Sequence, residues 1–365
     1  MASTLPKVPP LPVIHAVDRI RHRLAALQRR LVPGHVALRE IQMGGFLAQA
    51  VHAAAALGIA DALAAGPRQP GDLARTIGAD EDGLRRLMRV LISFEVFAQR
   101  TDGAYALTRV SRALRGDAPV SLRDLFLFFG SEYHRGHWSH LHDAVRTGHA
   151  VGPVLDGMSF FDYTAEHREL GELFDRAMTS VSNLAIAPLL AAYDFGRFGT
   201  IVDVGAGHGS LLIEILRHTE ARRGVIFDLP EVVAGLQDQI NRHELTDCLT
   251  VETGSFFDTV PKGGDAYILK HIVHDWSDTE AEHLLRTARA AMDPEATLLL
   301  IEMVLPAHKR PHASKFIDLE MLVNAPGRER TRDEYGNLLA RSGFALTRVV
   351  PTASADSVVE ARPMR

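Results

Sequence analysis

The pattern of apolar and polar residues predicts that the chain begins with an amphipathic helix. Its apolar positions recur every three or four residues, which places them on one helical face, and they are Ile14, Val17, Ile20, Leu24, Leu27 and Leu31. So narrow an apolar face predicts packing against a partner subunit or another domain; a helix on a membrane surface and a transit peptide remain alternatives. Four prolines within residues 1–12 predict an extended start before this helix.

The next segment has the element order of a winged helix. The predicted elements are helices over 45–63, 72–77 and 80–93, followed by strands over 94–97 and 105–108. Such a module often binds DNA through its second helix, but here that helix starts with Asp80, Glu81 and Asp82, whose charges would face phosphates. We therefore expect a structural or dimerising module and no nucleic-acid partner.

The rest of the chain changes from helices to alternating strands and helices. Residues 118–195 are predicted to be helical. The strands predicted beyond them cover 200–204, 224–227, 249–252, 266–269, 297–303 and 345–350, and the helices 211–217, 280–291 and 332–342. This alternation predicts an α/β fold with a doubly wound, mostly parallel sheet. We expect three parts: an arm and amphipathic helix (1–40), a winged-helix domain (41–118), and a helical linker with the α/β domain (119–365).

The composition is that of an ordinary globular protein. Hydrophobic residues make up 46% and charged residues 23% of the 365 residues, and the single cysteine, Cys248, has no partner for an internal disulfide. The net charge of −5 gives no general attraction to nucleic acid or anionic membranes. The most apolar window, 48–65, is interrupted by Gln49, His52 and Asp61. We expect a reduced, cytoplasmic protein without a membrane partner.

A glycine-rich turn follows the first strand of the α/β domain. Gly205, Gly207 and Gly209 allow a sharp turn and close approach of a ligand to the backbone. Asp228 follows the second strand, where an acid can accept hydrogen bonds from both ribose hydroxyls. Because Asp203 stands beside the turn, a cofactor with a positive charge suits this site better than a dinucleotide, and S-adenosylmethionine fits.

Candidate acid–base chemistry follows the strand predicted over 266–269. The end of this strand delivers Lys270, His271, His274 and Asp275 to the edge where doubly wound sheets bind ligands. Histidine is well suited to accept a proton near neutral pH, and Asp275 or another acid can orient it. A second group of histidines, at 134, 137, 140 and 142, has helical spacing, but no cysteine or H-E-x-x-H motif accompanies it, so we expect no metal site.

Several of these motifs together resemble the S-adenosylmethionine-dependent small-molecule O-methyltransferases, the family of caffeic acid and acetylserotonin methyltransferases. The motifs are Val202–Gly209, Phe227–Pro230, Leu269–Trp276 and Gly327–Thr331. The segments Phe160–Tyr163 and Phe174–Met178 look most like those of bacterial polyketide-tailoring members. The resemblance covers roughly residues 40–355. It implies an N-terminal winged-helix domain through which two copies form a homodimer, followed by a Rossmann-like methyltransferase domain.

The resemblance also implies roles for individual residues. His274 resembles the family's general base, and Glu302 and Glu329 resemble the acids that hold it. The residues that match cofactor contacts are Asp203, Gly205, Gly207, Asp228, Leu229, Ser255, Phe256, Lys270 and Trp276. Those expected to line the acceptor pocket are Trp138, Phe161, Met178, Met321 and Asn324.

Two positions depart from the family pattern. Ala206 replaces a glycine in the turn, and Ser255 stands where the family commonly has an aspartate beside the adenine, which predicts a weaker or missing hydrogen bond to the adenine amino group. The function expected is methyl transfer to a hydroxyl of a small, aromatic or polyketide-type acceptor. Two alternatives stay open: a relative converted to hydroxylation or decarboxylation of a polyketide, and a non-catalytic regulator that senses S-adenosylmethionine.

Overall fold

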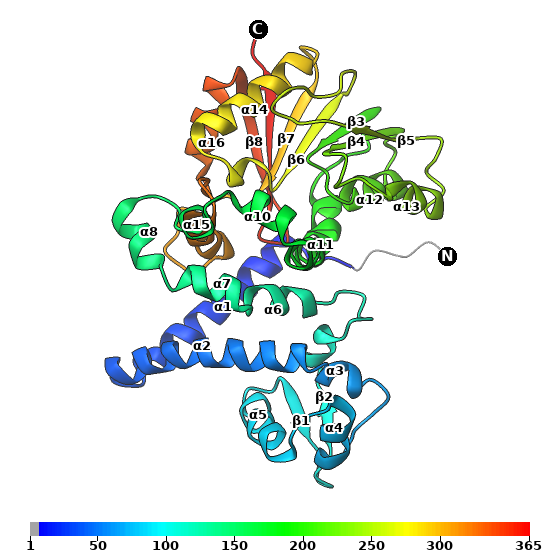
Figure 1. Cartoon of the computed structure of the whole chain (residues 1–365). Coiled ribbons are helices and arrows are strands. Elements are labelled where there is room, and N and C mark those ends of the chain that lie inside the picture. Colours follow the sequence, from blue (N-terminus) through cyan, green and yellow to red (C-terminus); the bar gives the residue numbers. More distant parts are fainter. Residues whose placement is uncertain (1–6) are drawn as a thin grey trace. The chain divides into compact units, whose positions relative to one another are not determined.

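A computed structural model describes residues 7–365, which form two compact units (Figure 1). One unit comprises the described part of Met1–Arg19, His140–Phe160 and Ser182–Arg365, and the other comprises Ile20–Ser139 and Phe161–Val181. Helices α1 (Leu11–Arg30) and α11 (Arg168–Ala192) each contribute residues to both units. The predicted three-part division of the chain stays a prediction.

The larger unit is built on a seven-stranded sheet with the strand order β5-β4-β3-β6-β7-β9-β8. The strands are β3 (Thr200–Val204), β4 (Arg223–Asp228), β5 (Leu249–Thr253), β6 (Ala266–Lys270), β7 (Thr297–Glu302), β8 (Phe344–Pro351) and β9 (Ser357–Pro363). The strand β9 runs antiparallel to β7 and β8, and all other neighbouring strands of this sheet are parallel. The predicted mostly parallel sheet is therefore confirmed. The sequence does not predict β9, because its buried pair Val358 and Val359 is followed at once by Glu360.

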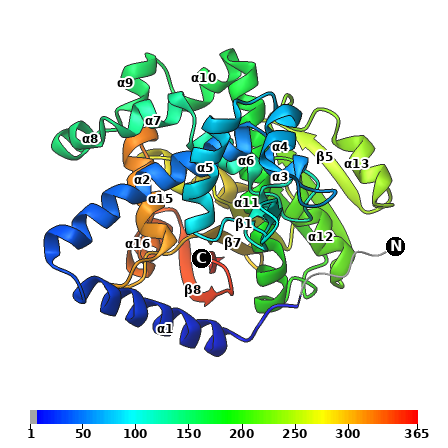
Figure 2. The ribbon, with the colours of Figure 1, turned by 90° about the horizontal axis from the view of Figure 1, so that it is seen from below.

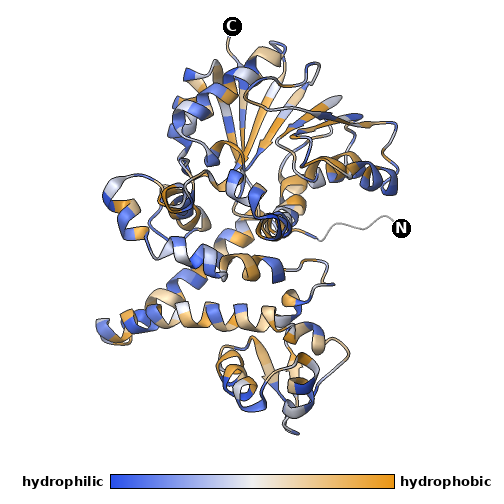
Figure 3. Cartoon of the chain, viewed as in Figure 1, coloured by the Kyte–Doolittle hydropathy of each residue, from blue (hydrophilic) through white to orange (hydrophobic). Residues whose placement is uncertain are grey.

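Helices pack on both faces of this sheet. One buried cluster joins the sheet to α12 (Ser210–His218), α13 (Leu236–Arg242) and the end of α11, and a second joins it to α14 (Asp278–Ala291) and α16 (Arg332–Arg341). The strands are mainly orange in Figure 3, as expected for strands covered on both faces. The sequence analysis missed α13 and also α15 (Ala313–Asn324).

Two helices of this unit begin at capping boxes. Ser277 and Thr331 each accept a hydrogen bond from the backbone of Glu280 and Glu334, whose carboxylates accept hydrogen bonds in return. The caps fix where α14 and α16 start. They therefore also fix the ends of the two loops that precede these helices, and both loops carry residues of the candidate site.

The smaller unit contains the winged helix, with two corrections to its predicted elements. Its elements are α2 (Gly34–Ala56), α3 (Ile59–Ala62), α4 (Pro70–Ile77), α5 (Glu81–Ser93), β1 (Phe97–Gln99), β2 (Tyr105–Leu107) and the 3₁₀ helix η1 (Ser111–Leu114). The single helix predicted over 45–63 is wrong at both ends. The helix α2 already starts at Gly34, and Gly58 adopts a left-handed φ of 64° that separates α3 from α2. The first strand starts three residues later than predicted, after a turn in which Glu95 has a φ of 56°.

The acidic start of α5 has a structural explanation. Asp80 is the N-cap of the helix, and its carboxylate accepts a hydrogen bond from the backbone N–H of Gly83. Glu81 and Asp82 lie in the first turn, where negative charge is stabilised by the helix dipole.

Helices fill the predicted helical stretch. They are α6 (Arg123–Phe129), α7 (Glu132–Trp138), α8 (Leu141–Thr147), α9 (Gly152–Asp156), α10 (Phe160–Glu166) and α11. The extended start predicted for residues 1–12 is shorter than expected, because α1 begins at Leu11 and only residues 7–10 precede it in the described part. Residues 1–6 of that prediction lie outside the described residues. Over residues 7–365, no helix combines the length and apolar character needed to cross a membrane.

Candidate active site

The glycine turn between β3 and α12 adopts a backbone that only glycine accommodates well. Gly205, Gly207 and Gly209 have φ values of 70°, 56° and 65°. A Cβ atom on Gly205 would lie 2.5 Å from Cδ1 of Ile272, and one on Gly209 would lie 2.3 Å from Cδ1 of Ile226. A side chain at either position would therefore force the neighbouring isoleucine side chain to shift.

Asp228 is the last residue of β4, and its carboxylate lies at this turn. Oδ2 accepts a hydrogen bond from the backbone N–H of Gly207 at 2.7 Å, and Oδ1 accepts one from Leu229 at 2.8 Å. Burial raises the pKa of Asp228, although both hydrogen bonds oppose that shift. The two backbone donors hold the carboxylate in one orientation. Gly207, Asp228 and Leu229, three of the residues predicted to contact the cofactor, therefore lie together.

Asp203 and Lys270 carry opposite charges at the carboxyl ends of β3 and β6, and each influences the pKa of the other. Burial raises the pKa of Asp203 to about 7, with the charge of Lys270 acting against the shift. Burial lowers the pKa of Lys270, whose ammonium group donates a hydrogen bond to Oγ of Ser182 at 2.9 Å. Within residues 7–365, the carboxylate of Asp203 accepts no hydrogen bond, which leaves its acceptors open to a positively charged ligand.

Aromatic residues from two loops lie next to the turn. Cε1 of Phe256 is 3.6 Å from the Cβ position of Gly205, and the rings of Phe257 and Trp276 meet edge to face at 4.7 Å between centroids. Ser255 shapes the first loop: its hydroxyl accepts a hydrogen bond from the backbone N–H of Phe257 at 3.2 Å. Ser255, which replaces the aspartate common in the family, thus stabilises the conformation of its own loop.

His274, Glu302 and Glu329 form a buried cluster. His274 lies in a 3₁₀ helix, η2 (Val273–Asp275), that follows β6, and Glu302 ends β7. Nδ1 of His274 is 2.8 Å from Oε1 of Glu329 and 3.7 Å from Oε2 of Glu302. The other oxygen of Glu302 accepts a hydrogen bond from the backbone N–H of Val273 at 3.0 Å. With Nδ1 directed at the glutamates, the proton of a neutral imidazole is assigned to Nδ1. Nε2, which lies 3.4 Å from Oδ1 of Asp275, is then the acceptor.

The charges of this cluster are strongly coupled. Burial alone would lower the pKa of His274, but the negative charges of Asp275, Glu302 and Glu329 outweigh burial and raise it to about 10. Burial and the neighbouring carboxylates raise the pKa of Glu302 to about 8, and burial raises that of Asp275 to about 6. Oε2 atoms of Glu302 and Glu329 are buried and accept no hydrogen bond. The cluster therefore favours a positive charge on the imidazole.

A metal ion has one candidate place among the described residues. His274, Glu302 and Glu329 are the only group of three or more His, Cys, Asp or Glu there whose ligand atoms lie within 4.8 Å of one another. The histidines at 134, 137, 140 and 142 do not form such a group; Nδ1 of His134 is 3.1 Å from the carbonyl oxygen of Phe129, and His140 pairs with Asp143.

His271 has a separate partner that the sequence analysis missed. Its Nε2 lies 3.0 Å from Oδ1 of Asp356, a buried residue in the turn between β8 and β9. Burial, reinforced by the charge of Lys270, lowers the pKa of His271 to about 4, so this ring is neutral near pH 7. The rings of His271 and His274 are 5.4 Å apart. We expect replacement of His271 to lower turnover much less than replacement of His274.

The expected acceptor-pocket residues fall in both units. Met321 and Asn324 lie on α15 in the larger unit, and Nδ2 of Asn324 donates a hydrogen bond to Oε1 of Glu320 at 2.7 Å. Trp138, Phe161 and Met178 lie on α7, α10 and α11 within the smaller unit. Their grouping in one pocket stays a prediction.

Gly327, the first residue of the motif Gly327–Thr331, has a packing role that the motif alone does not predict. A Cβ atom on Gly327 would lie 1.8 Å from the carbonyl oxygen of His274 and 2.5 Å from the carbonyl carbon of Asp275. The loop with Glu329 and the loop with His274 thus touch backbone to backbone, and this contact is possible only for glycine.

Comparison with known proteins identifies the family. An O-methyltransferase domain model matches residues 138–345, and an O-methyltransferase dimerisation domain model matches residues 40–117. The phenazine O-methyltransferase of Lysobacter antibioticus is 38% identical over 91% of this chain and 97% of its own length. The 8-amino-8-demethylriboflavin N,N-dimethyltransferase of Streptomyces davaonensis is 34% identical over 86% of this chain and 90% of its own.

A solved structure agrees with the sequence matches. The crystal structure of human N-acetylserotonin methyltransferase in complex with S-adenosylmethionine has a TM-score of 0.84 and 27% identity, over 92% of this chain and 99% of that chain. This chain belongs to the O-methyltransferase family and is an S-adenosylmethionine-dependent methyltransferase. The resemblance noted in the sequence, the methyltransferase fold and the cofactor are thereby confirmed.

We expect Gly327→Ala to lower the free energy of unfolding by about 1–3 kcal/mol or more, because the added methyl group overlaps the backbone of His274. Urea denaturation measures this change. Gly336→Ala is the matched control: Gly336 lies in α16, nothing lies closer than 3.6 Å to its Cβ position, and alanine favours the helix. Equal effects of the two substitutions would contradict the packing described.

Proposed function

We propose that the enzyme transfers a methyl group from S-adenosylmethionine to a hydroxyl group of a small aromatic or polyketide-type acceptor, with His274 as the general base. The observation that carries this proposal is the pairing of Nδ1 of His274 with Glu329 at 2.8 Å, which leaves Nε2 as a proton acceptor. S-adenosylmethionine, when bound, supplies an electrophilic methyl group on a sulfonium centre. The chain's own residues bind it, bind the acceptor and remove a proton.

The residues around the glycine turn suit the cofactor. Asp228 is oriented by two backbone N–H groups and would accept hydrogen bonds from the ribose hydroxyls. Asp203, Lys270 and the backbone of Gly205 and Gly207 would hold the methionine part, whose ammonium group matches the open acceptors of Asp203. The adenosine part would lie against the remaining predicted contacts, which are Leu229, Ser255, Phe256 and Trp276.

His274 would take the proton of the acceptor hydroxyl on Nε2. A phenol has a pKa near 10 and is a weak nucleophile at neutral pH, so a positioned base raises the rate. The imidazolium formed in this step is stabilised by Glu302 and Glu329, as the raised pKa of His274 indicates. This mechanism needs no metal ion, because the cluster itself accepts the proton.

The acceptor itself is proposed at the level of chemical class. Expected pocket residues include Trp138, Phe161, Met178, Met321 and Asn324, a largely apolar set that suits a flat ring. A nitrogen acceptor is a second candidate, because the Streptomyces davaonensis relative is an N,N-dimethyltransferase. A cytoplasmic location is part of the proposal, since both substrates are expected to be soluble metabolites.

The direct test is incubation with labelled S-adenosylmethionine and a panel of phenols, naphthols, anthraquinones and the matching aromatic amines. Label in a phenol product supports the proposal. Label only in amine products would favour the second candidate, and no label with any acceptor would contradict both.

With an acceptor from that panel, His274→Gln should lower turnover by roughly 10² to 10⁴-fold, the usual contribution of a positioned base. The affinity for S-adenosylhomocysteine, measured by calorimetry, should stay nearly constant. The wild-type rate should rise above pH 7, because a histidine with a pKa near 10 must be neutral to accept a proton. Full turnover of His274→Gln at pH 7 would show that the base assignment is wrong.

A homodimer is also part of the proposal. The dimerisation model covers residues 40–117. Helices α1 and α2, whose course Figure 2 shows, carry apolar side chains that are about half exposed or more. These side chains include Val17, Ile20, Leu24, Leu27, Leu38, Ile41, Met43 and Phe46, and Leu31, between the two helices, is exposed as well. A row of this size is unusual on a monomer and suits an obligate interface of more than about 2,000 Å².

Light scattering at micromolar concentration should give twice the chain mass of 40.0 kDa. Changing Leu24 and Leu27 together to glutamate should give the monomer mass, because two charges would be buried in the interface. Val154→Glu, at an exposed apolar residue of α9, is the control that should stay dimeric. A monomeric wild type would contradict the proposal.

A further inference from the structure

The base and its acidic partner lie on two loops outside the strands. The sheet holds the loop of His274, because the backbone N–H groups of His271 and Val273 donate hydrogen bonds to Ile301 and Glu302 of β7, but the loop of Glu329 has to be brought to it. His274 lies in η2, between β6 and α14, and Glu329 lies in the loop between α15 and α16. The distance of 2.8 Å between Nδ1 of His274 and Oε1 of Glu329 therefore requires something to fix the two loops against each other. Gly327 lets their backbones touch, but it supplies no attraction.

The side chain of Arg330 bridges the two loops. Nη1 donates hydrogen bonds to the carbonyl oxygens of Val273 at 3.1 Å and Arg328 at 3.2 Å. Nη2 donates to the carbonyl oxygen of Trp276 at 3.4 Å. Val273 and Trp276 flank His274, and Arg328 directly precedes Glu329. One guanidinium group therefore contacts both loops next to the catalytic residues.

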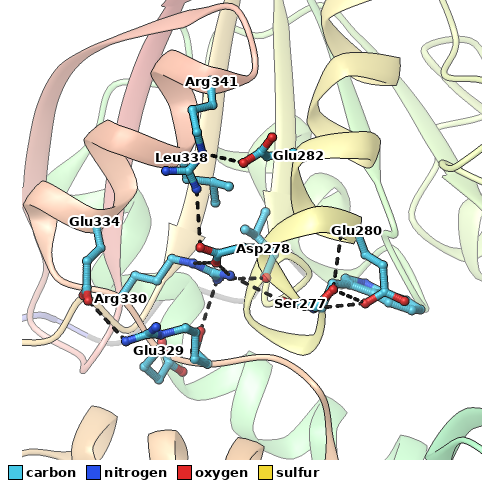
Figure 4. Close-up of polar contacts among 12 residues, drawn as sticks. Ser277, Asp278, Glu280, Glu282, Glu329, Arg330, Glu334, Leu338 and Arg341 are labelled. Atoms are coloured by element: carbon cyan, nitrogen blue, oxygen red, sulfur yellow. Dashed lines mark hydrogen bonds and ion pairs between the residues drawn. The ribbon is translucent and has the colours of Figure 1, made fainter.

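A carboxylate fixes this guanidinium group. Oδ1 of Asp278 accepts hydrogen bonds from Nη2 at 2.7 Å and from Nε at 3.2 Å, as Figure 4 shows. Arg330 is 1% exposed, so its charge needs such a partner inside the protein. Asp278 is in the first turn of α14, whose position the capping box fixes. The backbone of Arg330 is also held, because Leu305 donates a hydrogen bond to its carbonyl oxygen at 2.9 Å.

We propose that Arg330 is a positioning residue, which sets the distance between His274 and Glu329 by binding the backbone of both loops. The inference rests on the proposed role of His274 as base. Arginine suits this task because its planar group offers five N–H donors in a rigid fork, whereas lysine offers three donors on a single atom. A shift of about 1 Å in a catalytic group can lower the rate about 10²-fold.

The test compares Arg330→Lys and Arg330→Met with Arg341→Met. Arg341 is the matched control: it also pairs with Asp278, at 3.3 Å from Oδ2, but it contacts neither catalytic loop. Turnover at saturating substrates should fall at least about tenfold in Arg330→Lys and about 10²-fold in Arg330→Met, and stay near wild type in Arg341→Met. S-adenosylhomocysteine affinity should change little in all three, since the glycine turn and Asp228 are untouched.

Chemical rescue separates positioning from a general loss of structure. Millimolar guanidinium chloride should restore part of the turnover of Arg330→Ala, because the ion can occupy the emptied site, and should not restore His274→Gln. Wild-type turnover in a folded Arg330→Met would overturn the inference. Loss of folding in every Arg330 variant would also overturn it, by assigning a structural role only. A wild type without methyl transfer would instead contradict the proposed function.

Discussion

Two glutamates and one histidine are buried together where β6 and β7 end, and the cost of burying their charges governs much of the surrounding structure. A carboxylate without a partner is strongly disfavoured away from water, and Glu302 and Glu329 each retain one oxygen without a hydrogen bond. A proton on His274 compensates for this negative charge. The attraction between these carboxylates and the imidazolium would also stabilise the positive charge that His274 acquires when it takes a proton from the acceptor.

The fold provides the positions that this charge cluster needs. Parallel strands bring the ends of β6 and β7 to one edge, so Glu302 reaches the loop of His274 directly from the sheet. Glu329 comes from a loop, and its position depends on a glycine contact, a capping box and the buried Arg330. The cofactor turn is supported differently, by glycines whose packing excludes side chains and by backbone hydrogen bonds to Asp228.

The parts of the fold and the site that depend on local sequence patterns could be predicted from the sequence. Strand and helix periods predict the doubly wound sheet, and the glycine turn and Asp228 follow from their spacing within β3, α12 and β4. Roles for Glu302 and Glu329 came only from family resemblance, because their meeting with His274 depends on long-range contacts. Arg330 lies in the motif Gly327–Thr331, but its burial, like that of Asp356, is visible only after distant segments have packed. The break at Gly58 was missed because the alanine-rich pattern continues across it.

The central claim is that buried carboxylates raise the proton affinity of His274. NMR titration of the histidine rings measures it directly, with the His274 signal assigned from its absence in His274→Gln. We expect His274 in the wild-type protein to titrate well above the ordinary pKa near 6.5. Glu329→Gln should move the titration to lower pH, because one negative charge is removed. A His274 that titrates at or below 6.5, unchanged in Glu329→Gln, would contradict the central claim.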